Sequence, residues 1–102
     1  MKKIYIAGPI TGVPDYMRRF NDVEMNLRNA GWNVVNPAKN KGSQYKDYID
    51  VGLRQLMECD AIYLLDGYSN SPGATLEFMY AWTINMPIYP FGITLPKGWG
   101  RK

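Results

Sequence analysis

The segment Ala61-Ile62-Tyr63-Leu64-Leu65 decides the fold of this chain. Its residues are apolar or aromatic without the alternation of a strand that has one solvated face. A continuous run of this kind is typical of a central strand covered on both sides. Strands of this type occur mainly in parallel sheets with helices on both faces, so helices and strands should alternate along the chain.

Strand-like and helix-like segments do alternate around this run. Strands are predicted where a short β-branched or aromatic stretch ends at Gly or Pro: residues 3–7, 32–36 and 86–91. Helices are predicted where apolar residues recur every three or four positions: residues 16–30, 45–57 and 72–85. Asp15 and Ser71 are candidate N-caps, and Pro72 suits a first helical position. We therefore expect one α/β domain over residues 1–102, a Rossmann-like (flavodoxin-like) three-layer fold with a mostly parallel sheet of four to five strands.

Composition limits the chemistry that this chain can perform. The 102 residues include one cysteine, Cys59, and no histidine. Those counts exclude Ser-His-Asp and Cys-His catalysis, an internal disulfide and a multi-cysteine zinc site. Acid–base work must fall on carboxylates, tyrosines, lysines or water. We expect no metal and no other cofactor.

Charge and hydropathy favour a small anionic ligand over a large partner. The net charge is +3, and the basic residues are scattered along the chain. A nucleic-acid footprint is usually a denser basic stripe, so we expect no nucleic-acid partner.

The apolar runs are too short to span a bilayer, and the start of the chain lacks a signal-type cleavage pattern. A cytoplasmic protein without a membrane partner is the expectation.

The ligand site is expected at one edge of the sheet. Ligands of open parallel sheets bind beyond the carboxyl ends of the strands, which directs attention to the loops after Ala7, Asn36 and Leu65. In the first loop, Gly8 and Gly12 let the backbone approach an anion. The loop is neither a dinucleotide-binding motif nor a Walker A motif, and a tight strand-to-helix turn explains it equally well.

The start of the third predicted helix is the second candidate. Helix N-termini favour phosphate or carboxylate groups, and small residues frame this one. Helical side chains lean toward the N-terminus, so Glu77 should point back over Gly73 into the same pocket. The alternative is a solvent-exposed glutamate.

Asp60 precedes the central apolar run and is the third candidate. The end of the preceding helix or a local turn explains this aspartate equally well. Its neighbour Cys59 is expected to be a small buried residue.

Four motifs together resemble a known family: Tyr5–Pro9, Gly31–Pro37, Cys59–Ile62 and Ser71–Ala81. The chain is similar to the nucleoside 2-deoxyribosyltransferase-like superfamily, in particular to its small phage and bacterial members of undefined function. This resemblance implies a five-stranded α/β fold and cleavage of an N-glycosidic bond. It implies that Glu77 is the nucleophile, that Asp60 assists protonation of the base and that Tyr5 orients Glu77.

Two positions depart from the transferases. Ser71 stands where deoxyribosyltransferases usually carry aspartate, and the similar nucleoside 5′-monophosphate N-glycosidases carry a phosphate-binding serine there. Gly52 stands where many relatives have an acidic residue, with Asp50 nearby. The resemblance and the two loops together nominate these substrate- or phosphate-binding residues: Gly8, Pro9, Ile10, Gly12, Asn70, Ser71 and Gly73.

The expected function is cleavage or transfer at the N-glycosidic bond of a (deoxy)nucleoside or its 5′-monophosphate. The alternatives are a catalytically silent nucleotide-binding or sensing module, and a nucleic-acid-associated protein that uses the basic tail. The relatives form homo-oligomers, so a homodimer or larger homo-oligomer is expected. Its contact would involve Phe78, Met79 and Trp82, or the tail from Gly92.

Overall fold

The computed structural model describes residues 2–40 and 45–92. Its helices and strands follow the alternation expected from the sequence. In chain order they are β1 (Lys3–Ala7), α1 (Tyr16–Asn29), β2 (Asn33–Val35), the short 3₁₀ helix η1 (Pro37–Lys39), α2 (Tyr45–Met57), β3 (Ala61–Leu64), the 3₁₀ helix η2 (Tyr68–Asn70), α3 (Pro72–Thr83) and β4 (Ile88–Pro90).

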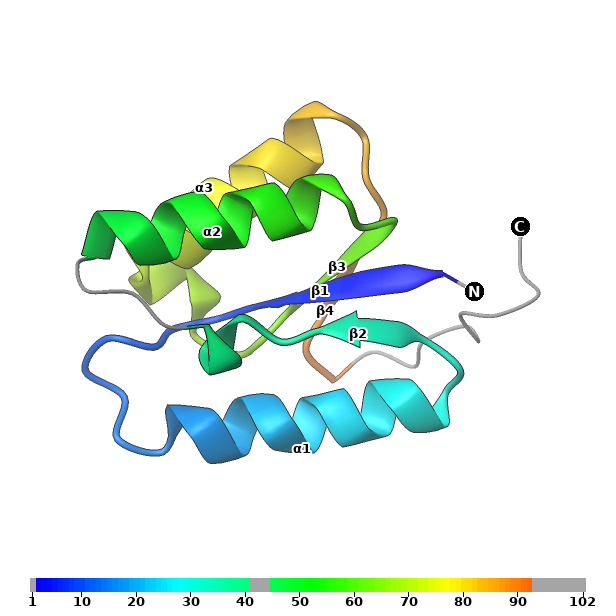
Figure 1. Cartoon of the computed structure of the whole chain (residues 1–102), viewed down its shortest axis with the longest axis horizontal. Helices are drawn as coiled ribbons and strands as arrows, with labels where there is room; N and C mark the ends of the chain where they lie inside the picture. Colours follow the sequence, from blue (N-terminus) through cyan, green and yellow to red (C-terminus); the bar gives the residue numbers. More distant parts are fainter. Residues whose placement is uncertain (1, 41–44, 93–102) are drawn as a thin grey trace.

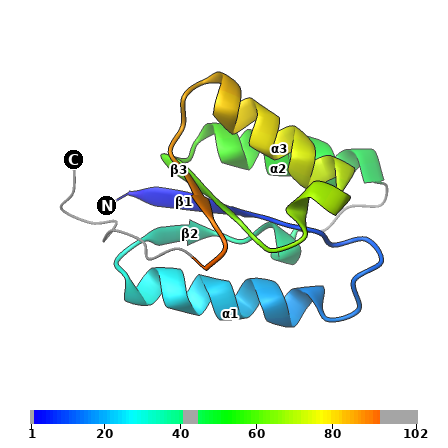
Figure 2. The ribbon, with the colours of Figure 1, turned by 180° about the vertical axis from the view of Figure 1, so that it is seen from behind.

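The four strands form one parallel sheet in the order β2-β1-β3-β4. Helix α1 covers one face, and α2 and α3 lie side by side on the other (Figures 1 and 2). The three-layer α/β fold predicted from the sequence is therefore confirmed, with four strands in the described residues rather than the five that the resemblance implied. The strand order reverses between β1 and β3, so a ligand is expected at their carboxyl ends.

Side chains of β1 alternate between the two layers. Ile4 and Ile6 pack with α1 in one buried cluster, and Tyr5 and Ala7 pack on the opposite face with residues of α2 and α3. This alternation sends the hydroxyl-bearing Tyr5 to the face that α2 and α3 cover. No helix in the described ranges is long and apolar enough to cross a membrane.

The two predicted N-caps behave differently. The Oγ atom of Ser71 accepts a hydrogen bond from the backbone amide of Ala74 at 3.2 Å, which confirms the cap of α3. Asp15 occupies the N-cap position of α1, but its side chain makes no capping hydrogen bond. Its carboxylate instead pairs with Arg18 at 2.7 Å on the helix surface, because Arg18 follows one turn later.

Candidate functional site

A cavity of about 140 Å³ lies at the carboxyl edge of the sheet. Residues from the loops after β1, β2 and β3 meet there, as the sequence predicted, and α2 supplies a further wall. The lining residues are Tyr5, Gly8, Ile10, Thr11, Pro37, Asn40, Tyr48, Ile49, Ser71, Gly73, Ala74 and Glu77.

Glu77 of α3 and Tyr5 of β1 form a buried pair in this cavity. The hydroxyl of Tyr5 donates a hydrogen bond to Oε2 of Glu77 at 2.6 Å, although the residues are 72 positions apart. Glu77 is 8% exposed and Tyr5 is fully buried. Burial raises the pKa of Glu77 from 4.5 to about 7, against the lowering effect of the hydrogen bond from Tyr5. Burial and the adjacent carboxylate raise the pKa of Tyr5 well above its ordinary value, so the phenol keeps its proton.

Gly52 of α2 lies directly against this pair. A side-chain carbon placed on Gly52 would come within 2.7 Å of the Tyr5 hydroxyl and 2.9 Å of Oε2 of Glu77. Both distances are shorter than carbon–oxygen contacts allow. A glycine inside a helix costs about 0.5–1 kcal/mol relative to alanine. The need to make room for the two oxygen atoms explains its presence here.

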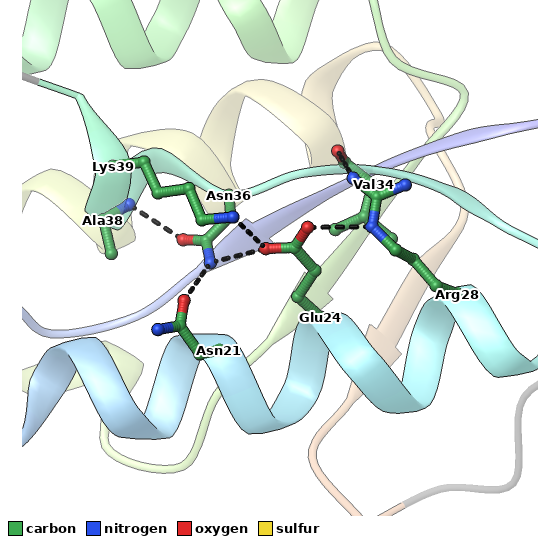
Figure 3. A network of polar contacts seen from close by, with 7 residues as sticks. All are labelled: Asn21, Glu24, Arg28, Val34, Asn36, Ala38 and Lys39. Carbon is green, nitrogen blue, oxygen red and sulfur yellow. Dashed lines mark hydrogen bonds and ion pairs between the residues drawn. The ribbon is translucent and has the colours of Figure 1, made fainter.

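A second polar cluster fixes the wall that follows β2 (Figure 3). The Nδ2 atom of Asn36 donates to Oε1 of Glu24 at 3.0 Å, and Oδ1 of Asn36 accepts the amide of Ala38, which caps η1. Arg28 and Lys39 contact the same Glu24 carboxylate at 2.8 and 3.1 Å. Burial would raise the pKa of Glu24, but these hydrogen bonds and the charge of Lys39 outweigh it and lower the pKa to about 2. The buried anion thus holds the turn that presents the Pro37 side of the cavity.

The same wall is tied to α2. The side-chain amides of Asn40 and Gln55 exchange two hydrogen bonds, at 2.7 and 3.1 Å. Because Gln55 lies less than one turn after Gly52, this link holds the part of α2 that covers the Tyr5–Glu77 pair. These two hydrogen bonds therefore connect the loop after β2 to α2 beside the cavity.

The predicted site residues separate into two groups. The structure brings six of them to the cavity: Tyr5, Gly8, Ile10, Ser71, Gly73 and Glu77. Four do not line it: Pro9, Gly12, Asn70 and Asp60. Two of the predicted glycines are required by the backbone itself. A side chain at Gly8 would meet Leu65 at 2.8 Å, and Gly12 adopts a φ of +80°.

Asp60 lies at the opposite edge of the sheet from the cavity. It precedes β3, and its Oδ2 atom accepts the backbone amide of Lys3, at the start of β1, at 2.9 Å. Its own amide donates to the carbonyl of Lys3 at 2.8 Å. The structure therefore corrects the placement of Asp60 near the reacting bond: its contacts are those of the local-turn alternative.

Six lining residues were not nominated from the sequence: Thr11, Pro37, Asn40, Tyr48, Ile49 and Ala74. Loop position would have suggested Thr11 and Asn40. Tyr48 and Ile49 belong to the apolar stripe of α2, where a cavity wall and a packed core have the same sequence pattern. Within the described ranges, no three acidic, cysteine or histidine side chains gather as metal ligands.

Comparison with solved structures defines the class of this α/β domain as deoxyribosyltransferase-like. A 2-deoxyribosyltransferase from Leishmania mexicana aligns with a TM-score of 0.70 and 25% identity, over 89% of this chain and 64% of its own. A 2-deoxyribosyltransferase from Bacillus psychrosaccharolyticus aligns with a TM-score of 0.68 and 18% identity, over 91% of this chain and 76% of its own. This chain thus spans less than two thirds of the Leishmania protein. The resemblance stated from the sequence motifs is confirmed.

The chain belongs to the family described as "Domain of unknown function (DUF4406)", which matches residues 2–89. A search of curated proteins gave no match.

Proposed function

We propose that this protein cleaves the N-glycosidic bond of a nucleoside or a nucleoside 5′-monophosphate, with Glu77 as the nucleophile. The observation that carries the proposal is the Tyr5–Glu77 pair, a buried carboxyl held by a phenol in a cavity beside a helix N-terminus. Its fold, which is shared with 2-deoxyribosyltransferases, supports the same chemistry.

Glu77 is suited to attack a carbon centre. With a pKa of about 7, close to half of the carboxyl is ionised at neutral pH, and burial leaves that anion poorly solvated. The Tyr5 hydroxyl occupies Oε2, which fixes the carboxylate and leaves Oε1 for the anomeric carbon. The resulting glycosyl-enzyme is resolved by water, which gives hydrolysis, or by a second base, which gives transfer.

Ser71 and the loop after β1 are proposed to hold a 5′-phosphate. Ser71 caps α3, whose first turn also contains Gly73, and the positive end of this helix favours an anion. Gly8 and Thr11 face the cavity from the neighbouring loop. One charge-assisted hydrogen bond contributes roughly 1.5–3 kcal/mol, or about ten- to a hundredfold in affinity.

The substitution Glu77→Gln tests the nucleophile. It keeps the shape of the side chain and its acceptor for Tyr5, so base release from a panel of nucleosides and monophosphates should fall by several orders of magnitude. Asp60→Asn is the matched control, because it also neutralises a carboxylate but lies at the other edge of the sheet. The control should retain activity within a few-fold. Nucleotide binding without base release by the wild type would instead indicate a nucleotide-binding module.

Self-association is a separate proposal. On α3, Met79 and Trp82 are 52% and 66% exposed, whereas Phe78 packs partly buried against Tyr68 at a ring distance of 5.5 Å. Burial of Met79 and Trp82 between two copies would remove apolar surface from water. Sedimentation of the wild type and of Trp82→Glu tests this contact. The tail after Gly92 lies outside the described residues.

A further inference from the structure

The described part of the cavity wall carries one carboxyl group. Among its described lining residues, Glu77 is the sole acidic or basic side chain apart from the phenols. The remaining polar groups are hydroxyls and one amide: Tyr5, Thr11, Asn40, Tyr48 and Ser71.

Cleavage of an N-glycosidic bond to a neutral base requires two functions. A nucleophile attacks the anomeric carbon, and an acid protonates the departing base, because an unprotonated purine or pyrimidine leaves as an anion. Glu77 cannot provide both in one step, since the nucleophile must be ionised when the bond breaks. The Tyr5 proton is already donated to Oε2 of Glu77, and the raised pKa of this phenol makes it a poor acid.

Position 52 of α2 leaves no room for a second carboxyl directly beside the pair. Gly52 faces both oxygen atoms of the pair, and even a single carbon there would come within 3 Å of each. A longer acidic side chain at this position would displace Glu77 or Tyr5. Asp60 is occupied with the backbone of Lys3 at the far edge of the sheet. Among the residues that the structure describes, Glu77 therefore has no carboxylic acid partner in the cavity.

We propose that the substrates of this site are N-glycosides whose base is already cationic, such as pyridinium nucleotides or N7-alkylated purine nucleotides. This inference rests on the proposed function of Glu77. A cationic base leaves without taking up a proton. An oxygen of Glu77 forms a bond to the anomeric carbon, the carbon–nitrogen bond breaks, and its electron pair neutralises the charge on the ring. Water then attacks the same carbon, the ester bond returns its electron pair to Glu77, and one proton is released to solvent.

The walls of the cavity suit such a base. Tyr48, Ile49 and Ile10 supply aromatic and apolar surface, and Glu77 supplies the one negative charge among the described lining residues. A cationic ring is attracted both to the face of an aromatic side chain and to a carboxylate. Its positive charge would also favour the ionised form of Glu77, which is the form that attacks.

The test compares each cationic substrate with a neutral partner of nearly the same shape. Nicotinamide mononucleotide is paired with its reduced dihydropyridine form, and N7-methylguanosine 5′-monophosphate with guanosine 5′-monophosphate, each as the ribo- and the 2′-deoxyribonucleotide. Base release is measured chromatographically after subtraction of hydrolysis without protein. A general acid typically contributes 10²–10⁴-fold, so kcat/KM for at least one cationic compound should exceed that of its partner by about 100-fold or more. The two pairs distinguish a pyridinium from an alkylated-purine substrate.

The pH profile provides an independent readout. Without an acid on the protein, the rate for nicotinamide mononucleotide, whose ring charge does not titrate in this range, should rise once as Glu77 ionises, near pH 7, and then stay level. Glu77→Gln should abolish it. Equal rates for cationic and neutral partners, or a bell-shaped profile, would overturn this inference and leave the proposed function standing. Base release from none of the compounds would overturn both.

Discussion

The free energy of unfolding should depend on pH in a way that reflects the burial of Glu77. The pKa of this carboxyl is about 7 in the folded protein against an ordinary value of 4.5. Each pH unit of this difference corresponds to about 1.36 kcal/mol, so the ionised form destabilises the folded state by about 3 kcal/mol. Glu77→Gln removes this cost while keeping an acceptor for the Tyr5 hydroxyl.

The sign follows from proton binding. Between pH 4.5 and about 7, the folded protein holds the Glu77 proton and the unfolded chain has lost it. Because the folded state binds more protons in this window, the free energy of unfolding falls as the pH rises. The stabilising effect of the protonated carboxyl is complete below pH 4.5, is lost as the pH rises through 7 and changes no further above it.

Urea titrations between pH 4 and 9 measure this effect, with the three tryptophans of the chain as a fluorescence signal. The free energy of unfolding of Glu77→Gln should match that of the wild type at pH 4. At pH 8 it should exceed the wild-type value by about 3 kcal/mol. A difference that does not change with pH would refute the assignment of Glu77 as a desolvated, poorly compensated carboxyl.

Glu24 gives the control, because it has the same exposed fraction as Glu77 and a pKa shifted in the opposite direction. Its pKa is lowered to about 2, so its ionised form stabilises the folded state above pH 4.5, and this contribution is lost as the pH falls through 2. Glu24→Gln should therefore destabilise the protein more at pH 7 than at pH 3.

Three further substitutions test the geometry of the site. Tyr5→Phe removes the hydrogen bond that lowers the pKa of Glu77, so the pH at which activity is half-maximal should move upward; a lower midpoint would contradict the role of this bond. Gly52→Ala should lower activity, because its methyl group meets the Tyr5 hydroxyl and Oε2 of Glu77. For the same reason it should lack the roughly 1 kcal/mol of stability that alanine normally adds inside a helix. A variant that is stabilised in urea titration and fully active would contradict this contact. Wild type should bind a deoxynucleoside monophosphate at least tenfold more tightly than the nucleoside, and Ser71→Asp should reverse that order in calorimetry; equal affinities for the wild type would exclude a phosphate site at Ser71.

Local geometry explains which parts of the site could be predicted. Ser71, Gly73 and Glu77 lie within two turns of one helix, so their spacing alone places them together. The continuous apolar run at Ala61–Leu64 likewise predicts a central parallel strand. The loops that follow such strands predict where the cavity lies. Features such as these lie within a single helix or strand, so the local sequence is sufficient to predict them.

For Asp60, the placement implied by the resemblance differs from the placement in the structure. In a parallel sheet, a residue before a strand lies at the amino edge, and ligands bind at the carboxyl edge. The position of Asp60 before Ala61 already implied this separation, and the register of Ile4 against Ala61 places it beside the start of β1. Gly52 is a different case. A glycine inside an amphipathic helix indicates that another group approaches closely, but only the structure identifies that group.

The two buried glutamates show why Glu77, rather than any other acid, defines the site. Both are 8% exposed, and burial acts on both in the same direction. Glu24 is compensated by two cations and an amide, so its charge is neutralised within a structural cluster. Glu77 has one neutral phenol as its hydrogen-bond partner and faces a cavity. The fold thus satisfies one buried carboxylate fully and leaves the other short of positive charge, and under the proposed function a cationic substrate would supply the missing charge.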